Sequence, residues 1–194
     1  MINTIKDRIK KSIATKQRVL EDESLLKTIQ EITDVMVTAF RNGNKVLFCG
    51  NGGSAADAQH LSAEFSGRYY KDREPLPSEA LHVNASYLTA VANDYSFDVV
   101  YSRLVNGFGK KGDILVALST SGNSPNIINA LQMACEKEMI TVGFSGETGG
   151  KMKAYCHYLI NIPSTDTPRI QESHILIGHI ICELVEEKYF GSGT

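Results

Sequence analysis

Apolar residues recur at every third or fourth position over much of the first forty residues, and polar residues interrupt the pattern at positions 22–24. Such spacing places apolar side chains on one face of a helix. The sequence therefore predicts two amphipathic helices over residues 1–40. Their apolar faces cover either the chain's own core or another subunit, and the pattern does not choose between these. The residues that carry it are Ile2, Ile5, Ile9, Ile13, Ile29, Ile32, Met36 and Phe40.

From residue 45 onward, short apolar runs alternate with helical stretches. The runs cover residues 46–49, 80–83, 114–118, 140–144 and 157–160. Continuous apolar strands joined by helical crossovers indicate a mainly parallel sheet that is covered on both faces. A last helix is expected from Thr167 and Pro168 to about Tyr189, because proline suits the first turn of a helix. We therefore expect one α/β domain over residues 1–194, with its core at 45–190.

Composition narrows the choice of partners and compartment. The net charge of −2 over 194 residues leaves no basic surface for a polyanion, so nucleic-acid binding is disfavoured. The four cysteines are scattered without a C-x-x-C pair, which argues against a metal knuckle and a secreted disulfide framework. No apolar run approaches about 18 residues, and the N-terminus lacks a signal-peptide pattern. We therefore expect a soluble, cytoplasmic protein with no membrane partner.

Two turns that follow apolar runs carry candidate chemistry. Residues 50–54 read Gly-Asn-Gly-Gly-Ser, and residues 119–125 read Ser-Thr-Ser-Gly-Asn-Ser-Pro. Ligands of open parallel sheets collect beyond the carboxyl ends of the strands, and hydroxyl groups beside a helix N-terminus suit a phosphate. Each segment alone is equally typical of an ordinary capped turn. The pair on one sheet edge favours a phosphorylated small molecule, and nucleotide signatures such as G-x-G-x-x-G are absent.

Two pairs of residues bear on a metal site. His60 and Glu64 are four residues apart and project from one helical face, while Gln171 and His179 are separated by about two turns of the last helix. Surface His/Glu pairs are common, and His179 lies among isoleucines, where a satisfied core histidine is the usual explanation. Spacing alone therefore does not predict a metal site.

Several separated motifs resemble one known family in the same order along nearly the whole chain. They are residues 49–54 (CGNGGS), 57–67 (DAQHLSAEFSG), 93–94 (ND), 118–125 (LSTSGNSP), 149–152 (GGKM) and 169–172 (RIQE). With these motifs the chain resembles the sedoheptulose 7-phosphate isomerases, or phosphoheptose isomerases, of the sugar isomerase (SIS) domain superfamily. The resemblance implies a flavodoxin-like, three-layer α/β/α sandwich with a five-stranded sheet. It also implies a homotetramer with active sites at subunit contacts.

The resemblance further implies one zinc ion per subunit, and it assigns site residues motif by motif. The implied zinc ligands are His60, Glu64, Gln171 and His179. The implied substrate-binding residues are Asn51, Gly52, Gly53, Glu64, Asn93, Asp94, Ser119, Thr120, Ser121, Ser124 and Gln171. The serine-rich turn would hold the phosphate, in agreement with the interpretation of that turn from its residues alone.

The implied reaction converts sedoheptulose 7-phosphate to D-glycero-D-manno-heptose 7-phosphate, which enters the synthesis of nucleotide-activated heptose for bacterial surface glycans such as lipopolysaccharide. Moving a carbonyl group between C1 and C2 needs an acid and a base, for which we assign Glu64 and His179 on opposite sides of the substrate, with zinc as the Lewis acid. Asp94 and Thr120 would relay protons or orient hydroxyl groups, or would serve only as capping and loop residues.

A non-catalytic alternative comes from the same superfamily. One relative of these isomerases is a regulator that binds the replication initiator protein, and it lacks the metal-binding glutamate and the histidine of the last helix. Both Glu64 and His179 are present here, which favours the enzyme. Sugar-phosphate-sensing SIS modules usually adjoin a further domain, and we expect none in this chain.

Overall fold

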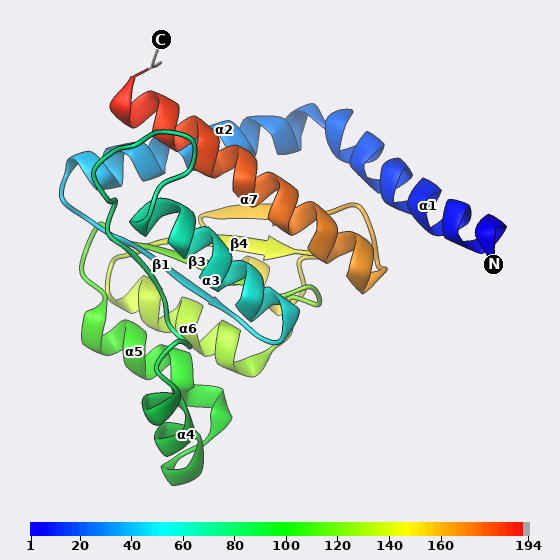
Figure 1. The fold of residues 1–194 in the computed structure, drawn as a ribbon. Helices are drawn as coiled ribbons and strands as arrows, with labels where there is room; N and C mark the ends of the chain where they lie inside the picture. The colour runs from blue at the N-terminus through cyan, green and yellow to red at the C-terminus, as the bar shows by residue number, and fades with distance from the viewer. Residues whose placement is uncertain (192–194) are drawn as a thin grey trace.

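The computed structural model describes residues 1–191. Over these residues the chain forms seven α-helices, two 3-10 helices and five strands (Figure 1). In chain order they are α1 (Ile2–Leu20), α2 (Glu23–Arg41), β1 (Val46–Gly50), α3 (Gly53–Ser66), β2 (Ser78–Ala80), α4 (Ala85–Asp94), η1 (Phe97–Val99), α5 (Val100–Phe108), β3 (Ile114–Leu118), α6 (Pro125–Glu136), β4 (Ile140–Ser145), η2 (Lys151–Tyr155), β5 (Tyr158–Asn161) and α7 (Thr167–Phe190).

The five strands form one parallel sheet in the order β2-β1-β3-β4-β5. This is the doubly wound, flavodoxin-like order, in which the chain reverses its direction of winding between β1 and β3. The carboxyl ends of β1 and β3 are neighbours, since Gly50 pairs with Leu118. The expected fold class is confirmed, and the glycine-rich and serine-rich turns leave the sheet side by side.

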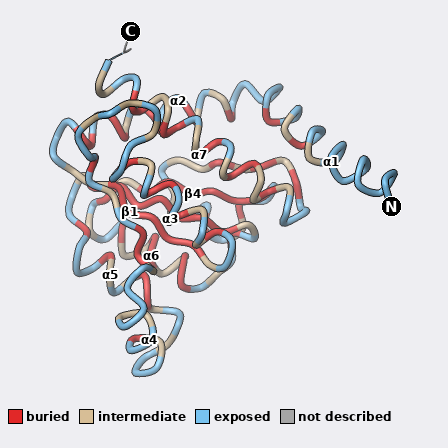
Figure 2. Tube along the Cα trace, viewed as in Figure 1, coloured by how far each residue is buried: buried red, intermediate tan, exposed pale blue. Residues whose placement is uncertain are grey.

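Alternate side chains of each strand enter two different cores, as the two-residue period of a strand requires. Phe48, Val116 and Phe144 pack with residues of α2, α3 and α7 on one face. Leu47 and Leu115 pack with residues of α5 and α6 on the other. Strands β1 and β3 are accordingly buried along their whole length, while helices shield both faces of the sheet (Figure 2).

One predicted strand is shifted along the sequence. The apolar run at residues 80–83 was expected to be a strand, but β2 covers Ser78–Ala80. After Ala80 the chain turns, because the N–H group of Val83 donates to the carbonyl oxygen of Ala80, and Asn84 then caps α4. The remaining expected strands and the last helix lie within a residue or two of their predicted positions. Among the described residues, no helix combines the length and apolar character needed to cross a bilayer.

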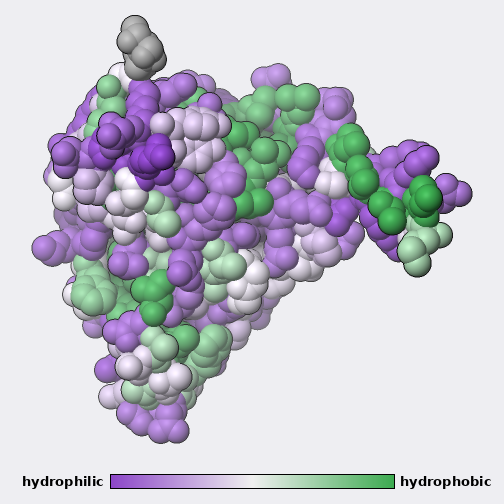
Figure 3. Space-filling model, viewed as in Figure 1, coloured by the Kyte–Doolittle hydropathy of each residue, from purple (hydrophilic) through white to green (hydrophobic). Residues whose placement is uncertain are grey.

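Helix α1 projects from the rest of the molecule (Figure 1). Its isoleucines at positions 2, 5, 9 and 13 are each more than half exposed and form an apolar stripe (Figure 3). Polar contacts attach the helix to α7: Ser12 donates to the Glu172 carboxylate at 2.7 Å, and Arg169 donates to the carbonyl oxygen of Arg8 at 2.8 Å. The predicted helices are confirmed, and the stripe of α1 does not lie on the chain's own core.

Candidate metal and sugar-phosphate site

The glycine-rich turn brings the start of α3 against both β1 and α7. A Cβ atom on Gly50 would lie 2.4 Å from the carbonyl oxygen of Ser54, so this position has room only for glycine. Gly52 has φ +54°, a left-handed conformation that glycine adopts without strain. A Cβ atom on Gly53 would lie 2.7 Å from Nε2 of Gln171. The amide of Gln171 therefore rests directly on the backbone of this turn.

Helices α3 and α7 approach each other closely one turn before the end of α3. A Cβ atom on Gly178 would lie 2.5 Å from Cδ1 of Leu61, so the missing side chain of Gly178 permits this approach. His60 precedes Leu61, and His179 follows Gly178. The packing of Gly178 against Leu61 thus brings the two imidazoles together, with their ring centroids 4.9 Å apart.

Three potential metal ligands converge at this point. Nε2 of His60 lies 3.0 Å from Oε1 of Glu64 and 3.4 Å from Nε2 of His179, and all three ligand atoms lie within 4.8 Å of one another. Donor atoms around a tetrahedral zinc ion, with bonds of about 2.0–2.1 Å, stand roughly 3.3 Å apart. The spacing and the nitrogen-rich donor set fit zinc better than magnesium or calcium.

Gln171 lies on the same helix as His179, eight residues earlier, and contacts the turn that begins α3. The four implied zinc ligands are therefore distributed along one seam between α3 and α7. His60, Glu64 and His179 form the cluster itself, and the structure places Gln171 toward the amino ends of both helices. That end of the seam faces the carboxyl ends of the strands.

The serine-rich turn is held by hydrogen bonds within itself and by a close contact between two glycines, Gly122 and Gly149. Gly122 has φ +65°, and a Cβ atom there would lie 2.3 Å from the carbonyl oxygen of Gly149. The hydroxyl groups of Ser119 and Ser124 lie 3.2 Å apart across the turn, and Ser121 accepts from the N–H group of Asn123 at 3.1 Å. Three of the predicted hydroxyl groups thus gather at the start of α6, whose first N–H groups are oriented toward the same space.

A cavity of about 210 Å³ lies beside this turn, between β3, β4 and the start of α7. Its lining includes Thr120 and Ser121 from the serine-rich turn and Thr167 and Ile170 from α7. Ile170 directly precedes Gln171 in α7, so the cavity ends at the first turn of that helix, while Gln171 and the three cluster residues are outside its lining. Polar groups therefore continue from the serine-rich turn to the amino end of α7.

Three predicted substrate-binding residues are placed differently. The side chain of Asn51 forms two reciprocal hydrogen bonds of 2.9 Å with the buried amide of Asn126, so it is directed toward α6. Asn93 and Asp94 are exposed at the end of α4, where Asn93 donates to Asp94 at 2.9 Å. Within residues 1–191 neither of them forms a hydrogen bond with another predicted site residue. The structure thus gathers the seam and the serine-rich turn, but it does not join Asn93 and Asp94 to them.

Two residues near the cluster were not assigned a role from the sequence. Asp57 lies one turn before His60; burial raises the pKa of its carboxyl group, and the interaction with His60 lowers it by a smaller amount. The ring of Tyr69 lies 6.0 Å from that of His179, and burial raises the pKa of its hydroxyl group to about 12. Asp57 lies on the same face of α3 as His60 and Glu64, at three- and four-residue spacing, and this spacing is the sequence signal that could have indicated it.

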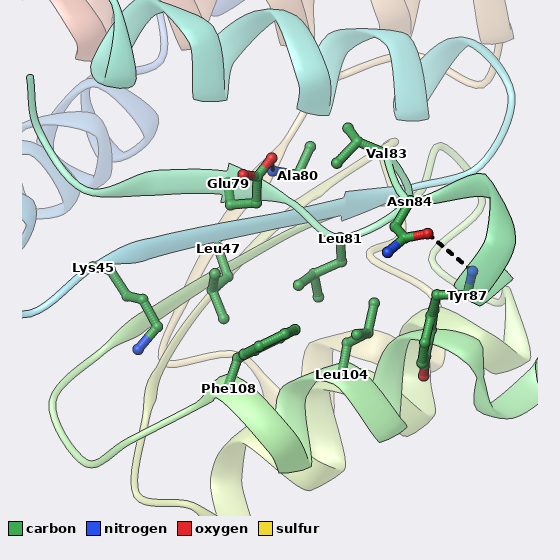
Figure 4. A pocket seen from close by; sticks show the side chains of 10 residues that line it. All are labelled: Lys45, Leu47, Glu79, Ala80, Leu81, Val83, Asn84, Tyr87, Leu104 and Phe108. Atoms are coloured by element: carbon green, nitrogen blue, oxygen red, sulfur yellow. Dashed lines mark hydrogen bonds between the residues drawn. The ribbon is translucent and has the colours of Figure 1, made fainter.

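A larger groove of about 490 Å³ lies elsewhere, between β1, β2 and helices α4 and α5 (Figure 4). Leu47, Leu81, Leu104 and Phe108 line it with apolar surface, and none of the predicted site residues contributes to it. A sugar phosphate needs many hydrogen-bonding partners, because its own polar groups lose water on binding. The smaller polar cavity is therefore the better candidate for such a ligand.

Comparison with known proteins identifies the family of the chain. Residues 9–146 match the family model of the SIS domain. The phosphoheptose isomerase of Aneurinibacillus thermoaerophilus is 53% identical over 190 residues, which cover 98% of this chain and 96% of that protein. The phosphoheptose isomerase of Clostridium acetobutylicum is 49% identical, with coverage of 98% and 97%. The solved structure of phosphoheptose isomerase from Neisseria gonorrhoeae aligns with a TM-score of 0.90 at 39% identity, covering 95% of this chain and 98% of that one.

Proposed function

The chain belongs to the SIS domain family and, within it, to the phosphoheptose isomerases, and on this basis we propose that it interconverts sedoheptulose 7-phosphate and D-glycero-D-manno-heptose 7-phosphate. The observation that carries the proposal is the convergence of His60, Glu64 and His179 on the seam between α3 and α7, the amino end of which lies at the sheet edge that carries the hydroxyl-lined cavity. The chain is an isomerase by its family, and this convergence is where we locate its chemistry. The product would supply heptose for surface glycans.

The phosphate group binds at the serine-rich turn in this proposal. Ser119, Ser121 and Ser124 offer hydroxyl donors, and the first N–H groups of α6 add the positive end of a helix dipole. This combination holds an anion without a lysine or an arginine. The sugar chain then extends along the start of α7, past Gln171 and toward the cluster on α3.

Glu64 and His179 carry the protons. One of them removes a proton from C1 of the ketose, and the electron pair forms a C1–C2 double bond while the C2 oxygen gains a proton. The hydroxyl group on C1 then loses its proton, and C2 receives one, which leaves the aldose. Their ligand atoms lie within 4.8 Å of each other, so no sugar carbon fits between them. In place of the expected arrangement on opposite sides of the substrate, we therefore propose that both act from one edge of it.

His60, Glu64 and His179, together with Gln171, would hold the zinc ion. When bound, zinc would act as a Lewis acid on the substrate oxygens. Gln171 is a neutral amide and a weak donor, so its position is the one that a substrate oxygen can share. Glu64 and His179 each have two tasks in this arrangement, as ligands and in proton transfer.

The assembly is proposed to be a homotetramer in the cytoplasm. The exposed isoleucine stripe of α1 supports this, because a partner subunit would cover an apolar surface that the chain itself leaves open. Asn93 and Asp94 would then join an active site across a contact between subunits. No nucleic-acid or membrane partner is part of the proposal.

The test uses purified protein with sedoheptulose 7-phosphate, followed by NMR for the heptose phosphate. We expect the aldose to form, zinc to copurify, and a chelator to stop turnover without unfolding the protein. Elemental analysis of wild type and His60→Ala should show zinc in the first and less in the second. Sugar-phosphate binding without any aldose would favour the non-catalytic regulator instead. Active wild type without zinc would remove the metal from the mechanism.

A further inference from the structure

A buried ion pair connects the two helices of the cluster. The carboxylate of Glu186, 2% exposed, lies on α7 seven residues after His179. It accepts from the backbone N–H groups of Tyr69, Tyr70 and Lys71 at 2.9–3.1 Å and from Nε of Arg73 at 2.8 Å. These four donors belong to the segment that leaves α3 and passes over α7 (Figure 1).

The guanidinium of Arg73 extends the connection to the end of α3. It donates to the carbonyl oxygens of Glu64 at 2.8 Å and Phe65 at 2.9 Å, and also to those of Gly67 and Glu74. The last carbonyl groups of a helix have no partner within that helix, and a cation there also complements the helix dipole. Arg73 therefore fixes the backbone of Glu64, while Glu186 fixes Arg73 to α7.

We propose that Arg73 and Glu186 are positioning residues that set the separation between the His60/Glu64 pair on α3 and His179 on α7. The inference rests on the proposed function, since it assigns a role in the same site. One short path of hydrogen bonds runs from the backbone of Glu64, through the two side chains, to the helix that carries His179. Glu186 also holds the N–H group of Tyr69, whose ring lies beside the His179 imidazole.

The pair is ionised near neutral pH. Burial raises the pKa of Glu186, but the hydrogen bonds from Arg73 and from three backbone N–H groups outweigh it, so the net pKa lies below the usual value. Two buried charges with this many partners are well satisfied, and losing one of them leaves the other without compensation. The experiment must therefore distinguish loss of fold stability from a change in the geometry of the cluster.

A second ion pair with a buried carboxylate provides the control. The carboxylate of Asp113 is also 2% exposed, and it accepts from the backbone N–H groups of Lys45 and Lys110 and from Nζ of Lys45. It lies at the amino ends of β1 and β3, at the opposite edge of the sheet from the cluster. Asp113→Asn should thus weaken the fold by a comparable mechanism without touching α3 or α7.

The experiment compares wild type, Glu186→Gln, Arg73→Lys and Asp113→Asn, each first freed of metal and then titrated with Co²⁺ while its d–d absorption is recorded. Isomerase kinetics and the melting temperature of the metal-free form are measured on the same samples. We expect Glu186→Gln and Arg73→Lys to bind Co²⁺ about 10-fold or more weakly than wild type. Their kcat should fall, while their KM should stay close to that of wild type. Asp113→Asn should melt earlier but keep the metal affinity and kcat of wild type.

Arg73→Lys is the decisive variant, and it remains available if Glu186→Gln fails to fold. Lysine keeps the charge opposite Glu186 but lacks the fork that reaches the carbonyl oxygens of Glu64 and Phe65. Wild-type Co²⁺ affinity, spectrum and kcat in this variant would show a merely stabilising pair and would overturn the proposal. If the wild type isomerises the sugar but binds no Co²⁺, the proposed metal site is refuted. If the wild type binds Co²⁺ and the variants behave like it, only the positioning role of Arg73 and Glu186 is refuted.

Discussion

The α3/α7 cluster and the serine-rich turn hold their polar groups by different means. The cluster takes His60 and Glu64 from one helix and His179 from another that is more than a hundred residues distant, and their meeting depends on Gly178 packing against Leu61. The turn takes its hydroxyl groups from six consecutive residues, and the left-handed Gly122, which packs against Gly149, sets its shape. The cluster therefore depends on how two distant helices pack, whereas the hydroxyl groups of the turn are already neighbours in the sequence.

This difference predicts where substitutions act. Changes in the cluster should remove chemistry, because its atoms touch the reacting carbons in the proposed mechanism. Changes in its supports should alter stability as well as chemistry. Changes in the turn should weaken the binding of the phosphate and leave the chemical step largely intact.

Glu64→Gln and His179→Gln are expected to have the largest effect. Each removes a group that can transfer a proton while it changes the side-chain volume little, so the rate should fall by about 10²- to 10⁴-fold or below detection. The measurement is kcat on sedoheptulose 7-phosphate, with circular dichroism and size-exclusion chromatography as checks on the fold and assembly.

Glu136→Gln, at the exposed end of α6, is the matched control and should keep wild-type kcat. Substantial activity in either cluster variant would contradict the assignment of acid and base. Insoluble protein would instead indicate that the residue supports the fold, and the variant would then give no information on proton transfer in the cluster.

The second prediction concerns His174, a fully buried anchor of α7. Its Nε2 lies 3.2 Å from the carbonyl oxygen of Ser145, and its Nδ1 has no partner among the described residues. Burial lowers the pKa of His174 from 6.5 to about 4, against a smaller raising effect of the bond to Ser145. The unfolded chain therefore binds a proton between pH 6.5 and 4 that the folded chain rejects, so stability falls as the pH drops through this range.

The stability lost through His174 amounts to as much as about 3 kcal/mol at pH 4, since one pKa unit corresponds to about 1.4 kcal/mol. His174→Gln keeps a donor toward Ser145 and has no such titration. Urea unfolding of both proteins at several pH values should show wild type losing more stability than the variant on acidification. Parallel pH dependences of the two proteins would mean that folding does not lower the pKa of His174, and that its imidazole is not buried as described.

The sequence predicted the two regions unequally, and their geometry explains why. Residues 119–125 could be recognised because the hydroxyl groups, the glycine and the helix start are neighbours in the chain. The pairing of His60 with His179 could not be predicted from spacing, because it depends on how α7 lies on α3 and on the absent side chain of Gly178. The ligand set came only from the resemblance to a family.

The same reasoning applies to the fold. Continuous apolar runs predicted the parallel sheet, since strands buried on both faces need them. The run at residues 80–83 misled because Leu81 is buried without being in a strand, next to the turn that leads into α4. Arg73 and Glu186 gave no signal at all: an arginine in a loop and a glutamate near the end of a helix are ordinary surface residues until the fold buries them together.

The smallest predicted effect belongs to the serine-rich turn. Ser119→Ala combined with Ser121→Ala removes two hydroxyl donors from the proposed phosphate site, at about 1 kcal/mol for each neutral hydrogen bond, or about fivefold in affinity for each. The fold should survive, because the backbone bond from Gly122 to Ser119 and the contact of Gly122 with Gly149 do not involve these hydroxyl groups. KM should therefore rise several-fold or more, while kcat at saturating substrate changes little.

The affinity for inorganic phosphate, tested as a competitive inhibitor, should fall in parallel, which assigns the loss to the phosphate end of the substrate. Ser66→Ala, at the carboxyl end of α3, removes a hydroxyl group bonded only within its own helix and should leave both constants unchanged. An unaltered KM in the double variant would place the phosphate elsewhere, and a fall in kcat instead would mean that the turn takes part in positioning the reacting carbons, as the cluster does.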